Sequence, residues 1–267
     1  MRSRVRHPRR LLCAGLATGV FAALSFAVSG SAPLPARMGM DQPEFQFIRM
    51  VYGNNPDFGG GGFGGFGRGS SWLTDAPEAE EHFLQGMQRL TRINTTGESK
   101  ALQLLDDEIF DYPFMYAVEV GRWYLPDLEA ARLREYLLRG GFLMVDDFHG
   151  SVQWEGFMES MRRVFPDKPV VEIPENHETF HVAFDLNQRV QIPGVAALMN
   201  GQTYEGDGVA PHWRGIFDDD GRLMVAINFN MDLGDAWEHA DTPGYPHHFT
   251  ALAYRFGIDY VLYTMTH

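Results

Sequence analysis

Short apolar runs alternate with longer stretches of helical spacing along most of the chain. Apolar residues recur every three or four positions in four stretches, which predicts helices over residues 76–93, 126–139, 152–165 and 246–256. Runs between and around them predict strands over residues 44–52, 114–120, 142–146, 170–173, 213–217, 222–228 and 258–264. Strands that alternate with helices of this length indicate an α/β domain with helices on both faces of its sheet.

The run over residues 142–146 is apolar at every position before Asp146. Runs of this kind belong to strands that are buried on both faces, so we expect this strand to be central and parallel to its neighbours. The runs at 213–217 and 222–228 flank an Asp-Gly turn and predict a hairpin. We expect this hairpin to extend one edge of the mostly parallel sheet with antiparallel strands.

The N-terminal region has the layout of an export signal. Basic residues precede an apolar run over residues 11–28, and small residues follow at 29–32. This order predicts a secretory signal peptide over residues 1–32 and a periplasmic or other extracytoplasmic location. The apolar run is also long enough to remain as an uncleaved membrane anchor, and both alternatives stay open. Residues 33–43 are expected to form a tether, and 44–267 a single domain.

Charge and cysteine content exclude several kinds of function. The formal net charge is −13, and removal of the arginine-rich signal would make it more negative. Phosphate contacts need a basic surface, so we expect no nucleic-acid partner. The single cysteine, Cys13, lies within the predicted signal. The domain therefore has no disulfide, no thiolate metal ligand and no cysteine nucleophile, and it also lacks the G-x-S-x-G pattern of a serine nucleophile.

Residues 177–181 read His-Glu-Thr-Phe-His, which matches the H-E-x-x-H signature of zinc peptidases. That site requires a helix, so that both imidazoles lie on one face. Pro174 lies just upstream, and residues 182–186 alternate as in an extended segment. In an extended chain the two histidines would lie about 13 Å apart, too far to share one ion. We therefore interpret the match as accidental and do not expect His177 and His181 to bind metal.

Eight glycines crowd residues 59–69, after one predicted strand and before a predicted helix. A phosphate-binding loop would end in Gly-Lys-Ser or Gly-Lys-Thr, and this run ends in Gly-Arg-Gly-Ser-Ser. We interpret it as a surface loop, with a cover over an active site as the alternative.

Polar side chains follow two of the most apolar strand runs. Asp146, Asp147 and His149 end the 142–146 run, and a cluster that includes Asp232 and Glu238 follows the 222–228 run. Ligands of open α/β sheets bind at the carboxyl ends of the strands. These five side chains could bind a divalent metal or supply a general acid and base, so they are the candidate catalytic residues.

We expect one of the two adjacent aspartates, His149, and Asp232 or Glu238 to line one cleft, within about 10 Å of each other if both strands are parallel. Arg49 and Arg122 are the expected cationic partners. The alternative is structural. Asp147 or Ser151 would then cap the following helix, and Asp146 would hold a neighbouring loop.

Three segments together resemble a bacterial family known as domain of unknown function 4159. They are YLLRGGFLMVDDFHG at 136–150, HETFHVAFDL at 177–186 and NMDLGDAWEH at 230–239. The resemblance covers roughly residues 44–267. It implies a fold like that of class I glutamine amidotransferases and trehalose-utilisation-type proteins, a flavodoxin-like three-layer α/β sandwich. It also implies that the first histidine of HETFH is not a fixed feature, which leaves His181 as a structural or pocket residue. The amidotransferase cysteine is missing, so that reaction does not carry over.

The leading interpretation is an exported α/β domain that binds a ligand or serves as an accessory module of the cell envelope. Its partner would be a small polar ligand or an envelope protein, with membrane contact only through residues 11–28 if these stay uncleaved. The alternative is a hydrolase, with or without a metal, that acts on a carbohydrate or another small polar substrate. A zinc peptidase is the third hypothesis. Whether the chain is an enzyme, and whether a divalent metal is its cofactor, stay open at this point.

Overall fold

The computed structural model describes residues 43–56 and 70–267 of the chain. The predicted signal peptide and the glycine run at 59–69 lie outside these residues. The fold below is that of the unit Asp41–His267. In the described part of the chain, no helix is both long enough and apolar enough to cross a bilayer.

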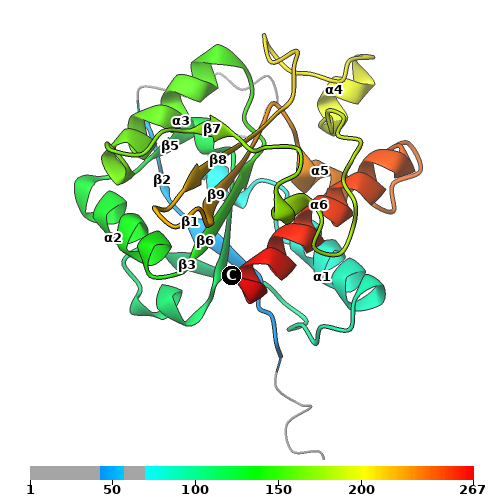
Figure 1. The fold of residues 1–267 in the computed structure, drawn as a ribbon. Coiled ribbons are helices and arrows are strands. Elements are labelled where there is room, and N and C mark those ends of the chain that lie inside the picture. The colour runs from blue at the N-terminus through cyan, green and yellow to red at the C-terminus, as the bar shows by residue number, and fades with distance from the viewer. Residues whose placement is uncertain (1–42, 57–69) are drawn as a thin grey trace, which may run out of the picture. The chain divides into compact units, whose positions relative to one another are not determined.

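A seven-stranded sheet lies at the centre of this unit (Figure 1). Its order is β3-β1-β4-β6-β9-β8-β7. The strands are β1 (Ile48–Val51), β3 (Lys100–Gln103), β4 (Phe114–Val118), β6 (Phe142–Asp146), β7 (Val171–Glu172), β8 (His212–Phe217) and β9 (Leu223–Phe229). Two short strands, β2 (Gly53–Asn54) and β5 (Trp123–Tyr124), form a separate antiparallel pair.

The strand β6 is central, as predicted. It pairs in parallel with β4 on one side and β9 on the other, and each of its five residues is buried. The strands β3, β1, β4, β6 and β9 are parallel. At one edge, β8 pairs antiparallel with β9, and β7 pairs antiparallel with β8. The predicted hairpin is therefore confirmed as β8 and β9, although β9 also belongs to the parallel part of the sheet.

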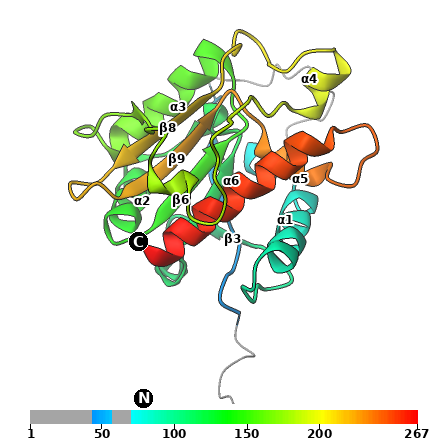
Figure 2. The same ribbon diagram turned by 45° about the vertical axis from the view of Figure 1, so that its right-hand side comes forward.

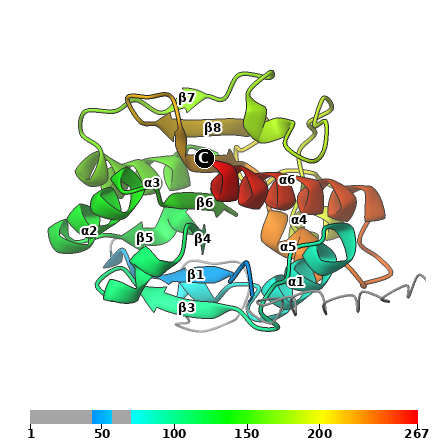
Figure 3. The same ribbon diagram turned by 60° about the horizontal axis from the view of Figure 1, so that its bottom comes forward.

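Helices cover both faces of the sheet, which confirms the α/β class. Figures 1 and 3 show α2 (Asp127–Leu138) and α3 (Gly150–Val164) on one side, and α1 (Glu78–Leu90) and α6 (His247–Thr266) on the other. The short helices α4 (Val195–Met199) and α5 (Leu233–Glu238) lie near one end of the strands. Alternate residues of β6 divide the core. Phe142 and Met144 pack toward α1 and α6, and Leu143 and Val145 toward α2 and α3.

One predicted strand is wrong. Residues 258–264 belong to the twenty-residue helix α6, which runs beside α5 and α1 (Figure 2). Its buried side chains recur at helical spacing through Phe249, Ala253, Phe256, Tyr260 and Tyr263, so one apolar stripe covers the sheet. Gly257 lies between the predicted helix at 246–256 and the predicted strand at 258–264. A Cβ there would lie 2.5 Å from Phe83 and 2.9 Å from Trp237, so the glycine permits close packing inside the helix.

The strand β3 was not predicted. Only one of its four residues, Leu102, is buried, because β3 lies at the edge of the sheet. An edge strand that is mostly exposed lacks the apolar run by which the inner strands are recognised.

Candidate functional site

The carboxyl ends of β4, β6 and β9 lie side by side, because the three strands are parallel and in register. Val118 pairs with Asp146, and Val145 pairs with Ile227. The loops that leave β6 and β9 therefore meet at one edge of the sheet. The polar residues of both loops gather at this edge.

Three aspartates from separate segments converge there. One carboxylate oxygen each of Asp75, Asp147 and Asp232 lies within 4.8 Å of the other two. We call this group the three-aspartate cluster. Asp147 follows β6, Asp232 follows β9, and Asp75 comes from the loop before α1. The sequence predicted that Asp146 or Asp147 would lie near Asp232 or Glu238, but Asp75 was not among the candidate residues.

The cluster is acidic and shielded from water. Asp147 is 8% exposed and Asp232 is 4% exposed, and a buried oxygen of Asp75 has no hydrogen-bond partner among the described residues. Burial raises the pKa of all three carboxyls well above its ordinary value, and repulsion from neighbouring acids, Asp235 among them in each case, raises it further. Within residues 43–56 and 70–267, no arginine or lysine forms an ion pair with the cluster.

The expected cationic partners contact other acids. Arg49 forms a buried ion pair with Glu80, and Arg122 pairs with Glu119 at 3.1 Å. Arg49 still lowers the pKa of Asp75, but this effect is smaller than that of burial. The three-aspartate cluster is thus left without a neutralising side chain among the described residues.

Asp146 holds a neighbouring loop, as the alternative interpretation proposed. Its Oδ2 atom accepts hydrogen bonds from the backbone amides of Leu233 at 2.7 Å and Gly234 at 3.2 Å, at the start of α5. The side chain is fully buried, and burial raises its pKa to about 6 although the Tyr116 hydroxyl and the two amides lower it. Asp146 therefore joins the end of β6 to the loop after β9.

His149 lies beside the cluster. Its Nε2 atom is 3.2 Å from Asp147 Oδ1, and its buried Nδ1 atom has no partner among the described residues. Burial lowers the pKa of His149, although nearby acids raise it, so the imidazole is neutral near pH 7. A neutral ring that donates from Nε2 to Asp147 has a free lone pair on Nδ1, which can accept a proton.

The alternative in which Asp147 or Ser151 caps the following helix is wrong. The helix α3 begins at Gly150, and the acceptors at its start come from other segments. Asp207 accepts from the Ser151 amide at 2.9 Å and from the Ser151 hydroxyl at 2.7 Å, and Asn230 accepts from the Gly150 amide at 2.8 Å. The carboxylate of Asp147 is consequently not used as a cap.

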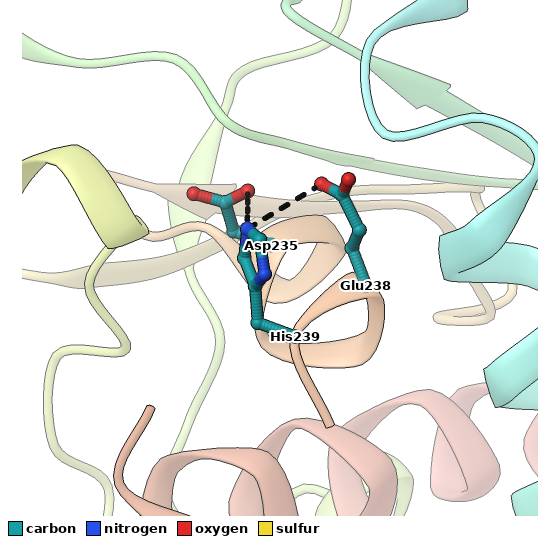
Figure 4. A group of neighbouring side chains, drawn as sticks. All are labelled: Asp235, Glu238 and His239. Carbon is teal, nitrogen blue, oxygen red and sulfur yellow. Dashed lines mark ion pairs between the residues drawn. The ribbon is translucent and has the colours of Figure 1, made fainter. Parts of the chain in front are cut away.

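Glu238 belongs to a second group on α5, together with Asp235 and His239. One ligand atom of each lies within 4.8 Å of the other two, and we call this group the α5 cluster. Figure 4 shows the imidazole of His239 pointing toward both carboxylates, with Nε2 at 3.6 Å from Asp235 and 3.7 Å from Glu238. All three side chains are partly exposed.

Backbone strain is concentrated around these groups. Four described residues other than glycine have a positive φ angle, namely Asp75, Glu119, Asp147 and Asn230. Two belong to the three-aspartate cluster. Glu119 acts electrostatically on Asp147, and Asn230 lies two positions before Asp232. Such conformations cost about 1–3 kcal/mol each and are typical of functional sites.

A cavity of 350 Å³ opens beside the site. Gly150, which follows His149, and Asn230 form part of its wall, and the rest includes Trp154, Arg214 and Phe229. The guanidinium of Arg214 lies 4.5 Å from the centre of the Trp154 ring. The cavity therefore offers apolar, aromatic and charged surface, and its size suits a small molecule, but none of the five predicted site residues lines it.

The HETFH segment lies elsewhere and is not a regular helix. Only Glu178–Phe180 forms a 3-10 turn. The His177 ring accepts from the Thr179 amide and packs against Phe217, while both nitrogens of His181 have partners, Asp185 and the backbone of Glu175. The two histidines thus have separate surroundings.

Comparison with known proteins agrees with the sequence resemblance. The model of the family described as domain of unknown function (DUF4159) matches residues 61–265. The chain belongs to this family. No curated protein matches the chain. Membership of DUF4159 assigns no reaction, so the function has to be argued from the site itself.

Proposed function

We propose that this DUF4159 domain binds a divalent cation through Asp75, Asp147 and Asp232 and uses the cation to hold a small polar ligand. One observation carries the proposal. Three carboxylates approach within 4.8 Å of one another in buried surroundings, without an arginine or lysine partner among the described residues. Buried carboxylates that are not neutralised cost several kcal/mol, so they require a proton or a cation.

The ligand chemistry favours a hard cation. All three candidate ligands are carboxylate oxygens, which suit Mg²⁺, Mn²⁺ or Ca²⁺ rather than zinc. A cation held at one edge of the cluster keeps coordination positions open for ligand oxygens. The remainder of such a ligand would occupy the 350 Å³ cavity that begins at Gly150 and Asn230.

A metal-assisted hydrolase is the second candidate, and His149 favours it. Its neutral ring is hydrogen-bonded to Asp147, and its Nδ1 atom is free to take a proton from a water molecule that attacks the substrate. The substrate would be a carbohydrate or another small polar molecule. This candidate predicts that His149→Gln abolishes turnover of any substrate found while leaving cation affinity nearly unchanged.

The proposal also includes export of the chain and a relation of its fold to a known superfold. The basic, apolar and small segments at residues 1–32 support a place in the cell envelope. The mostly parallel sheet with helices on both faces supports a relation to the amidotransferase-like superfold for residues 44–267, without its cysteine chemistry. Fractionation of cells that produce the tagged full chain tests the location, and recovery in the cytoplasm alone would contradict export.

The cation is tested on the purified chain after treatment with a chelator. Calorimetric titration with Mg²⁺, Mn²⁺ and Ca²⁺ should detect binding, and the midpoint of thermal unfolding should rise with cation concentration. Asp147→Asn and Asp232→Asn should each weaken binding at least tenfold. Asp219→Asn is the matched control, because the Asp219 side chain is 98% exposed and belongs to neither group of clustered acids. If the parent chain binds none of the three cations, protons neutralise the cluster and the proposal is wrong.

A further inference from the structure

We propose that the α5 cluster binds a second divalent cation next to the first, with Asp232 shared between the two. This inference rests on the proposed first cation site. Asp235 and Glu238 lie three positions apart on α5, and His239 directly follows its last residue, so the three side chains share one face. Their ligand atoms lie within 4.8 Å of one another.

Gly194 shows that the two clusters adjoin. A Cβ atom on Gly194 would lie 2.6 Å from Asp232 Oδ2, 3.0 Å from Glu205 Oε1 and 3.1 Å from Asp235 Oδ2. Three carboxylate oxygens, two from the start of α5 and one from Glu205, thus converge beside a residue that has no side chain. Asp232 belongs to the first site and Asp235 to the second, so the two sites are neighbours.

Asp232 is placed to bridge them. It is 96% buried, and its Oδ1 atom accepts a hydrogen bond of 2.7 Å from the Asp235 amide. Its Oδ2 atom accepts no hydrogen bond within the described part of the chain and points to the space near Gly194. An oxygen of a buried aspartate that accepts no hydrogen bond among the described residues and lies between two groups of metal ligands suits a bridging position in a two-metal site, in which the ions lie about 3.5–4 Å apart.

The balance of charge supports two ions rather than one. The two clusters together hold five carboxylates, those of Asp75, Asp147, Asp232, Asp235 and Glu238. One divalent cation would leave three of five negative charges uncompensated, whereas two would leave one. The expected cationic partners, Arg49 and Arg122, are already paired with Glu80 and Glu119.

The second site differs in chemistry from the first, because it contains an imidazole. His239 Nδ1 lies 3.2 Å from the Thr242 hydroxyl, which orients the ring so that Nε2 faces the carboxylates. An imidazole with two carboxylates suits Mn²⁺ or Zn²⁺ better than Mg²⁺ or Ca²⁺. Mn²⁺ accepts both ligand sets and is therefore the probe for the test.

The experiment counts Mn²⁺ in the purified full chain after chelator treatment, reloading and removal of free metal. Elemental analysis should give two Mn²⁺ per chain, and electron paramagnetic resonance should show the spin coupling of two neighbouring ions. The double variant Glu238→Gln/His239→Gln should retain one ion and lose the coupling. Glu155→Gln, an exposed glutamate on α3, is the control and should keep two.

The outcomes separate the two proposals. One ion in the parent that Asp147→Asn removes would leave the proposed function standing and overturn the second site. No ion would contradict both. Two ions that persist, still coupled, in the double variant would place the second ion elsewhere and overturn this inference. Far-ultraviolet circular dichroism of each variant verifies that the fold is kept, which is expected because Glu238 and His239 are partly exposed.

Discussion

Asp259 offers a test of the electrostatic reasoning at a position away from the proposed cation sites. It lies on α6 and is fully buried. Its Oδ1 atom accepts from the amides of Ala183 at 3.0 Å and Phe184 at 3.1 Å, and thereby fixes the chain that follows the HETFH segment. Its Oδ2 atom has no partner among the described residues. The perturbation is Asp259→Asn, in which the amide oxygen keeps both backbone hydrogen bonds.

The magnitude follows from the pKa of Asp259. Burial raises this pKa from 3.8 to about 6, although the two amides and His181 lower it. The folded state therefore binds the proton more tightly than the unfolded state. The resulting stabilisation is fully present below pH 4 and is lost as the pH rises through 6. Two pH units correspond to about 3 kcal/mol of unfolding free energy.

The assay is urea unfolding of the parent and Asp259→Asn chains from pH 4 to pH 8, with chelator present so that cations do not contribute. The difference in unfolding free energy, variant minus parent, should increase by about 3 kcal/mol over this range. His181 and Asp185, which also face Asp259, remain in both chains, so most of their titration cancels. Asp219→Asn should show no such change. A constant difference between Asp259→Asn and the parent across the range would refute the reasoning.

Three further predictions concern the site. Gly194→Ala should weaken cation binding at least tenfold in calorimetry, because the new Cβ lies 2.6 Å from Asp232 Oδ2; unchanged affinity in a folded variant would contradict this. Asp207→Ala should lower the unfolding free energy by about 1 kcal/mol, since the Ser151 amide and hydroxyl at the start of α3 lose their acceptor. An unaltered urea midpoint would count against that role. Cation affinity should also fall from pH 8 to pH 6, because protons compete with the cation for the three aspartates, whose pKa is raised. An affinity that does not change with pH would contradict this competition.

The sequence allowed the centre of the fold to be predicted, because buried strands leave a local signal. The run before Asp146 is apolar at every position, and this alone placed β6 inside a parallel sheet. The parallel arrangement in turn placed the loops after β6 and β9 at the same edge. Asp147 and Asp232 could therefore be brought together without coordinates.

The remainder of the site depends on contacts between distant segments. Asp75 precedes α1 and reaches the cluster only through the packing of α1 against α5. Glu205 and Gly194 lie in the long connection between β7 and β8, whose regular elements are a 3-10 turn and the five-residue helix α4. The helix cap shows the same limit, because Asp207 replaces the local residues that a cap normally uses. Residues 258–264 were misread for a different reason. A short apolar run is compatible with either a strand or a buried helix.

The electrostatics of the strand ends argue that the site is kept for binding rather than for stability. Each aspartate of the three-aspartate cluster has a raised pKa, so each ionised form opposes folding at neutral pH. Asp75 and Asp147 also adopt positive φ angles, which add strain. Asparagine in these positions would remove the charge with little change of shape. A chain under selection for stability alone would gain from such replacements, whereas a chain that must hold cations would lose its ligands. This cost in stability supports the proposed cation site, because a cation bound to the cluster would offset it.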